Sequence, residues 1–173
     1  MVKSSSSTSN KIFKFLSVTV VGFGLCTAMT SPARAEDFVY NGNFCTPILG
    51  DANKLQYYAQ WGVSNVSNTL ATVQCPFIHR FTQSSVPVNR VVVTLYDRHS
   101  QENVTCTLYG LGLEGSILWQ VSQSSSGSGT QHKFMELKPP QQGVAGINMV
   151  CTLPRLGENL GQSHIASYWV STP

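Results

Sequence analysis

The fold of this chain is restricted most by a series of short runs in which apolar and polar residues alternate. Eight such runs fit β-strands, at residues 57–63, 72–78, 90–97, 104–111, 117–122, 132–137, 147–153 and 164–171. The segments between them are rich in Gly, Pro, Ser and Asn, which favour turns. A short helix within residues 52–60 also fits the local sequence. Short strands without long helices predict antiparallel sheets.

We therefore predict one all-β domain over residues 36–173, built as a single antiparallel β-sandwich of about eight short strands. The pattern fits a jelly-roll and an immunoglobulin-like topology equally. Alternate residues of a strand face the same side of a sheet. Val91, Val93 and Leu95 are accordingly expected to face the core.

The first 35 residues have the features of a signal peptide. Three lysines precede an apolar stretch that is short for a membrane span, and Ala33-Arg34-Ala35 matches a small-x-small cleavage site. We expect cleavage after Ala35 and export, either to the periplasm or into the medium. A lipoprotein is the alternative because the leader contains Cys26, but the bulky Leu25 before it disfavours lipid attachment.

Removal of this leader changes the net charge. Four of the 11 basic residues lie within it, whereas all 8 acidic residues follow it, so the exported chain has a formal charge of −1. Such a chain lacks the excess of Lys and Arg that binds a phosphate backbone. We expect no nucleic-acid partner, no cofactor and, after cleavage, no membrane contact.

Four cysteines follow the leader: Cys45, Cys75, Cys106 and Cys151. An even number in an exported chain predicts two disulfides, and the wide spacing lacks the close pairs typical of zinc sites. Chain order and a short internal similarity favour disulfides between Cys45 and Cys75 and between Cys106 and Cys151. The similar segments are NVTCTLYGLG at residues 103–112 and NMVCTLPRLG at residues 148–157. Both segments place Cys and Leu on one face of a strand and Thr on the other.

Three aromatic residues form the candidate ligand-binding site: Tyr57, Tyr58 and Trp61. Flat aromatic side chains on an exposed surface bind sugar rings or the apolar patch of a protein. We therefore predict a site here for a glycan, a cell surface or a protein ligand. The alternative is that the alternating Tyr57 and Trp61 enter the core.

A small secreted hydrolase is the alternative function. Asp97, Arg98, His99 and Glu102 form the densest ionisable cluster, on the turn between two predicted strands, where a loop can present an acid, a base and a cation together. Such a hydrolase would use Asp97, His99 or Glu102. The chain contains no G-x-S-x-G and no H-E-x-x-H motif. We predict no catalytic and no metal-binding residues, and we interpret the scattered histidines as solvated or hydrogen-bonded, namely His79, His99, His132 and His164.

Three segments carry a resemblance to known proteins: GVSNVSNTLATVQCPFIHR, VVVTLYDRHSQENVTCTL and NMVCTLP. Through them the chain resembles, over most of residues 40–170, a loosely defined group of small exported bacterial all-β proteins with no established activity. The resemblance implies a compact all-β domain with the four cysteines in two disulfides, and it supplies no catalytic residues. It leaves the function open. The missing catalytic motifs and the many polar strand faces favour a non-enzymatic exported module with a binding or structural role.

Overall fold

The structure is a computed structural model, and it describes residues 37–48, 50–77, 88–140, 142–157 and 161–172. Within these residues the chain forms eleven strands and two short 3₁₀ helices, η1 (Gly42–Phe44) and η2 (Asp51–Lys54), and no α-helix. The leader expected at residues 1–35 lies outside the described residues. The all-β prediction is confirmed.

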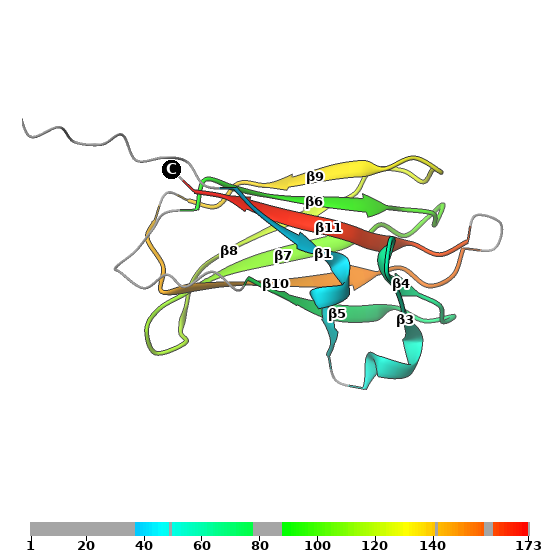
Figure 1. Ribbon diagram of the computed structural model, residues 1–173, viewed down its shortest axis with the longest axis horizontal. Coiled ribbons are helices and arrows are strands. Elements are labelled where there is room, and N and C mark those ends of the chain that lie inside the picture. Colours follow the sequence, from blue (N-terminus) through cyan, green and yellow to red (C-terminus); the bar gives the residue numbers. More distant parts are fainter. Residues whose placement is uncertain (1–36, 49, 78–87, 141, 158–160, 173) are drawn as a thin grey trace, which may run out of the picture. The chain divides into compact units, whose positions relative to one another are not determined.

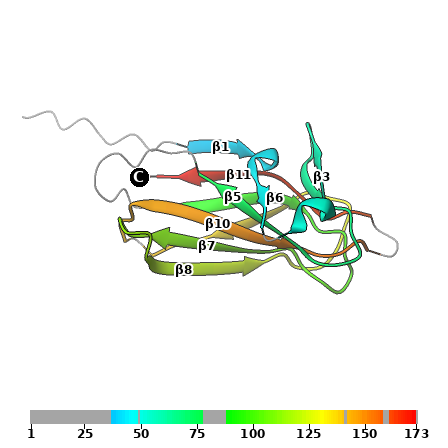
Figure 2. The ribbon, with the colours of Figure 1, turned by 90° about the horizontal axis from the view of Figure 1, so that it is seen from below.

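The strands form two antiparallel sheets (Figures 1 and 2). Sheet 1 contains six strands: β1 (Asp37–Asn41), β3 (Leu55–Tyr58), β4 (Gly62–Asn65), β6 (Arg90–Tyr96), β9 (Lys133–Leu137) and β11 (His164–Ser171). Sheet 2 contains five: β2 (Thr46–Pro47), β5 (Ala71–Pro76), β7 (Thr105–Leu111), β8 (Ile117–Ser124) and β10 (Gly146–Leu153). Their inner faces pack together as the predicted sandwich.

The strand order decides between the two topologies that the sequence left open. Sheet 1 runs β3-β4-β11-β6-β9, and sheet 2 runs β2-β5-β10-β7-β8. From β4 to β11, consecutive strands alternate between the two sheets, except that β7 and β8 form a hairpin. This order, β4-β11-β6-β9 facing β5-β10-β7-β8, is that of a jelly roll.

Strand β11 is the centre of sheet 1. It pairs with β6 along one side, and its other side is divided between two strands. β4 pairs with His164 and Ile165, whereas β1 pairs with the rest of the strand, from Ser167 to Ser171. Figure 1 shows β11 lying between β6 and β1. One strand therefore joins three others into a single sheet.

The side-chain alternation predicted for the strands determines the core. Val91, Val93 and Leu95 are fully buried, as expected. Along β7 and β10, buried and partly exposed residues alternate without interruption. Burying one face of each strand is the main favourable contribution to the stability of such a domain.

Both predicted disulfides are present, with the preferred pairing. Cys106 lies directly opposite Cys151 in the β7–β10 ladder, so their disulfide joins neighbouring strands of one sheet. Cys45, just before β2, is bonded to Cys75 of β5. All four residues are fully buried. Both disulfides therefore belong to sheet 2, and neither connects the two sheets.

Two local predictions are wrong. The single strand expected over residues 57–63 is a hairpin, in which β3 and β4 are separated by a turn at residues 59–61. Gly62 makes this turn possible because its φ is +75° and a Cβ atom there would lie 1.9 Å from the carbonyl oxygen of Ile165. The short helix expected around residues 52–60 is wrong beyond Lys54, because the 3₁₀ helix η2 ends there and β3 begins at Leu55. Strands β1 and β2 were not predicted.

Candidate functional site

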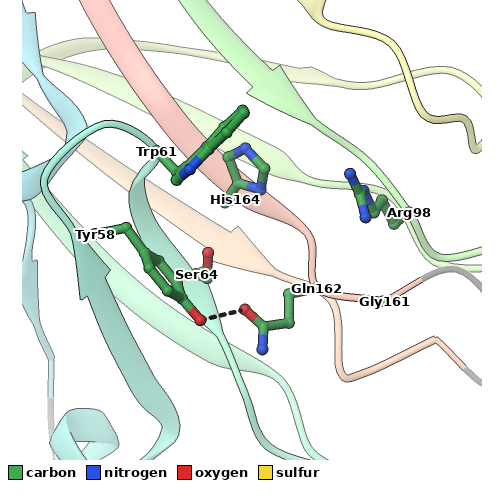
Figure 3. A pocket seen from close by; sticks show the side chains of 7 residues that line it. All are labelled: Tyr58, Trp61, Ser64, Arg98, Gly161, Gln162 and His164. Atoms are coloured by element: carbon green, nitrogen blue, oxygen red, sulfur yellow. Dashed lines mark hydrogen bonds between the residues drawn. The ribbon is translucent and has the colours of Figure 1, made fainter.

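A pocket of about 340 Å³ lies where the β3–β4 hairpin, the end of β6 and the start of β11 meet. The residues that line it come from three separate parts of the sequence (Figure 3): Tyr58, Trp61, Ser64, Arg98, Gly161, Gln162 and His164. They combine aromatic, hydroxyl, amide, imidazole and guanidinium groups. This mixture of apolar surface and a few polar groups is typical of small-molecule sites.

Strand pairing places His164 in the lining of this pocket. His164 is opposite Ser64 of β4 on one side and opposite Tyr96 of β6 on the other. The next residue, Ile165, faces the core and is fully buried. Because adjacent strand residues face opposite sides, His164 projects from the outer face of sheet 1. The register of three strands thus fixes the position of its imidazole.

Trp61 covers the imidazole from the tip of the β3–β4 turn. Its ring lies edge-on to the His164 ring, with 6.1 Å between the centroids, and 6.2 Å from the ring of Tyr96. Nevertheless, 47% of the Trp61 surface is exposed, which leaves part of the indole open to a ligand. The turn at Gly62 brings this side chain back over β11.

The His164 side chain is buried and neutral. Only 6% of its surface is exposed, and this burial lowers its pKa from 6.5 to about 4. The backbone of Gln162 opposes the shift, whereas the positive charge of Arg98 and the nearby His132 add to it. Among the described residues, its Nε2 atom has no hydrogen-bond partner. A buried polar atom without a partner is uncommon in folded proteins.

Tyr58 and Gln162 form the polar wall of the pocket. The Tyr58 hydroxyl lies 3.1 Å from Oε1 of Gln162, as Figure 3 shows, and 2.7 Å from Oε1 of Gln56. A tyrosine hydroxyl has one proton, so it donates to one of these oxygens at a time. This shared contact links β3 to the segment before β11 and orients the Gln162 amide at the pocket.

The structure separates the three predicted aromatic residues. Tyr58 and Trp61 line the pocket, whereas Tyr57 does not. Tyr57 points to the other side of β3, opposite Val63, with 43% of its surface exposed. The ligand-binding role of all three remains a prediction.

The hydrolase cluster of Asp97, His99 and Glu102 has structural contacts instead. Asp97 is fully buried and accepts hydrogen bonds from the Ser125 hydroxyl and from the backbone N–H of His99. His99 Nδ1 accepts from the backbone N–H of Glu102 at 2.8 Å. Glu102 Oε1 is 3.2 Å from Nε of Arg155. These contacts stabilise the turn after β6, and none of the three residues lines the pocket described above.

Sequence reasoning missed Ser64, Arg98, Gln162 and His164 as pocket residues. His164 was interpreted as solvated or hydrogen-bonded. It is buried rather than solvated, its ring contacts the backbone of Gln162, and its Nε2 atom has no partner among the described residues. No short motif joins these positions, because the pairing of β11 with β4 and β6 brings them together. His79 lies outside the described residues.

Two kinds of feature are absent from the described residues. Within those ranges, no three His, Cys, Asp or Glu side chains are grouped so that they could hold a metal ion. Nor does that part of the chain contain a helix long and apolar enough to cross a membrane.

No model of a known protein family matches the chain, and no curated protein matches its sequence. Solved structures to which this chain is similar include a low-affinity xylan-binding module, CBM86, from Roseburia intestinalis (13% identity, 80% of this chain and 96% of that one, TM-score 0.48). CsCBM6-3 from Clostridium stercorarium, in complex with cellobiose, has 12% identity, 76% and 90% coverage and a TM-score of 0.44. The enzymatically active domain of tailspike protein 4 from bacteriophage CBA120 has 10% identity, 79% and 19% coverage and a TM-score of 0.43. At these values no property of the three proteins is carried over to this chain.

Proposed function

We propose that this protein is an exported, non-enzymatic β-sandwich module that binds a saccharide in the pocket between Trp61 and Gln162. One observation carries the proposal: a half-exposed indole stands over a buried, neutral imidazole whose Nε2 atom has no partner among the described residues. A sugar ring has an apolar C–H face and a rim of hydroxyl groups. It can therefore satisfy an aromatic surface and a hydrogen-bond acceptor at the same time.

The other lining residues support this assignment. Tyr58, Ser64 and Gln162 offer hydroxyl and amide groups that both donate and accept hydrogen bonds, as sugar hydroxyls require. Glycoside hydrolysis generally uses a pair of carboxylates on either side of the scissile bond. The described lining residues supply no carboxylate, and this composition favours binding over hydrolysis.

Export is supported by the leader pattern and by the two disulfides. Structural disulfides form and persist outside the cytosol, where the redox environment is oxidising. Both disulfides are fully buried: Cys106–Cys151 joins β7 to β10, and Cys45–Cys75 joins the residue before β2 to β5. The ligand would then be a saccharide that the protein meets in the periplasm or in the medium.

Binding can be tested by presenting the purified, oxidised protein to immobilised glycans and then measuring the hits by titration calorimetry. We expect Trp61→Ala to weaken binding about tenfold or more, because an aromatic contact contributes about 0.5–1.5 kcal/mol beyond the area that it buries. Its thermal midpoint should remain close to that of the unmodified protein, because the side chain is half exposed.

Phe134→Ala is the matched control. Phe134 lies on β9, is 73% exposed and does not line the pocket, so its removal should leave the affinity unchanged. The proposal is refuted if no glycan is bound. It is also refuted if a bound glycan is held equally well by the folded Trp61→Ala variant.

A further inference from the structure

His164 lines the pocket, and its buried Nε2 atom has no hydrogen-bond partner among the described residues. The imidazole ring is fixed on two sides. Tyr96 lies 4.3 Å away between centroids with an interplanar angle of 35°, and Trp61 lies edge-on at 6.1 Å. A ring held in this way cannot turn freely to find another partner, and a contact with the Gln162 backbone further restricts it.

We infer that His164 selects the ligand by accepting a hydrogen bond from a saccharide hydroxyl at Nε2, so that the pocket takes a neutral hydroxyl group at this position. This inference rests on the proposed function, because it specifies the chemistry of the same site. A carboxylate, sulfate or phosphate oxygen without a proton cannot donate to this lone pair. Such a group would leave Nε2 unpaired in the complex.

The surroundings of His164 keep the ring in its neutral form. The charged and titratable groups that face it are Arg98 just after β6, His132 before β9, Tyr96 on β6 and Tyr58 on β3. The positive charge of Arg98 opposes a second charge on the imidazole, and so does His132. The backbone of Gln162 favours a proton on the ring, and Nε2 has no partner for one among the described residues, so we expect the proton on Nδ1. Nε2 is then the acceptor.

The tautomer can be tested without any ligand. Nitrogen-15 NMR of the histidine side chains distinguishes a protonated ring nitrogen from a bare one. At pH 7 we expect His164 to carry its proton on Nδ1 and to show a bare Nε2. A proton on Nε2 at this pH would overturn the inference and would leave saccharide binding itself untouched.

The selectivity is tested with two variants that differ in one property. His164→Phe keeps a ring of similar shape but removes the acceptor, whereas His164→Gln keeps an oxygen that can accept. The probes are neutral cello-, xylo-, manno- and galacto-oligosaccharides, with oligogalacturonate as the charged comparison. For the neutral oligosaccharide that binds, we expect His164→Phe to lower the affinity roughly ten- to a hundredfold and His164→Gln to lower it less.

The outcomes separate the two proposals. If a neutral oligosaccharide binds and the folded His164→Phe variant retains its affinity, the inference about His164 is wrong and the proposed function stands. The inference is also wrong, and the proposed function stands, if His164→Phe weakens the binding of oligogalacturonate but not that of the neutral oligosaccharides. If none of the probes and no immobilised glycan binds the unmodified protein, the proposed function fails and the inference fails with it.

Discussion

Acidification should destabilise this protein through one side chain, His164. Its pKa is about 4 in the folded state because burial disfavours the charged imidazole, and the ordinary value of 6.5 applies when the chain unfolds. Above pH 6.5 the imidazole is neutral in both states, so it has no effect on folding. As the pH falls from 6.5 towards 4, the unfolded chain gains a proton that the folded chain does not bind. The free energy of unfolding therefore decreases over this window.

The two pKa values determine the size of the effect. Their separation corresponds to a maximal loss of about 3 kcal/mol, of which about 2 kcal/mol is reached at pH 5. Asp51 does not interfere in this window. Its pKa is lowered by hydrogen bonds to Lys54 and to the backbone N–H of Thr72, so any contribution is present above 3.8 and is lost only below it.

The assay is urea denaturation at pH 7 and at pH 5, followed by tryptophan fluorescence, for the unmodified protein and for His164→Gln. Other groups titrate equally in both proteins, so the difference between their pH dependences isolates His164. We expect the variant to lose about 2 kcal/mol less than the unmodified protein between the two pH values. If both lose the same amount with equal m-values, His164 is not held neutral in the folded state.

Two further predictions concern the disulfides and the hairpin turn. Replacing Cys106 and Cys151 together by alanine should lower the free energy of unfolding by up to about 4 kcal/mol, because this disulfide closes a loop of 45 residues. The same replacement of Cys45 and Cys75, which close a loop of 30 residues, should lower it by up to about 3.6 kcal/mol. Denaturant titration of both variants measures these losses, and a loss below about 1 kcal/mol for either would contradict the loop argument. Gly62→Ala should cost about 2 kcal/mol or more, since the new Cβ would meet a carbonyl oxygen of β11 at 1.9 Å with φ at +75°. Gly146→Ala is its control, because a Cβ atom at Gly146 would have no heavy atom within 4 Å. Equal losses of stability in the two variants would show that the close approach to β11 is not the reason for a glycine at position 62.

The sequence predicted the fold better than the site, and the reason is physical. Alternation along one strand is a local pattern, and burying one face of each strand preserves it in the structure, as along β7 and β10. The cysteine pairing was predicted from chain order and from two Cys-Thr-Leu segments, each of which places its Cys and Leu on one face of a strand and its Thr on the other. The β3–β4 turn was missed because Gly62 is its only strong turn signal, and Tyr57 to Val63 otherwise alternates like one strand.

The site was only partly predictable because it is assembled by strand register. Tyr58 and Trp61 were found as neighbouring aromatic residues. His164 has no distinguishing neighbours in the sequence, and its burial results from lying between Ser64 and Tyr96 under the indole. The side chains of Arg98 and Gln162 reach the same pocket from the ends of different connections. A pattern within one segment of the sequence does not predict that residues from separate segments line the same pocket.

The central position of β11 has a consequence for the order in which the protein can assemble. Among the described strands, β11 is synthesised after all the others, yet it is the common neighbour of β1, β4 and β6. A chain interrupted before residue 164 keeps every cysteine of both disulfides but lacks the strand that joins sheet 1 and the imidazole of the pocket. Both disulfides of sheet 2 can therefore form in a chain whose sheet 1 still lacks β11. The proposed ligand binding would show that β11 has been synthesised, whereas disulfide formation would not.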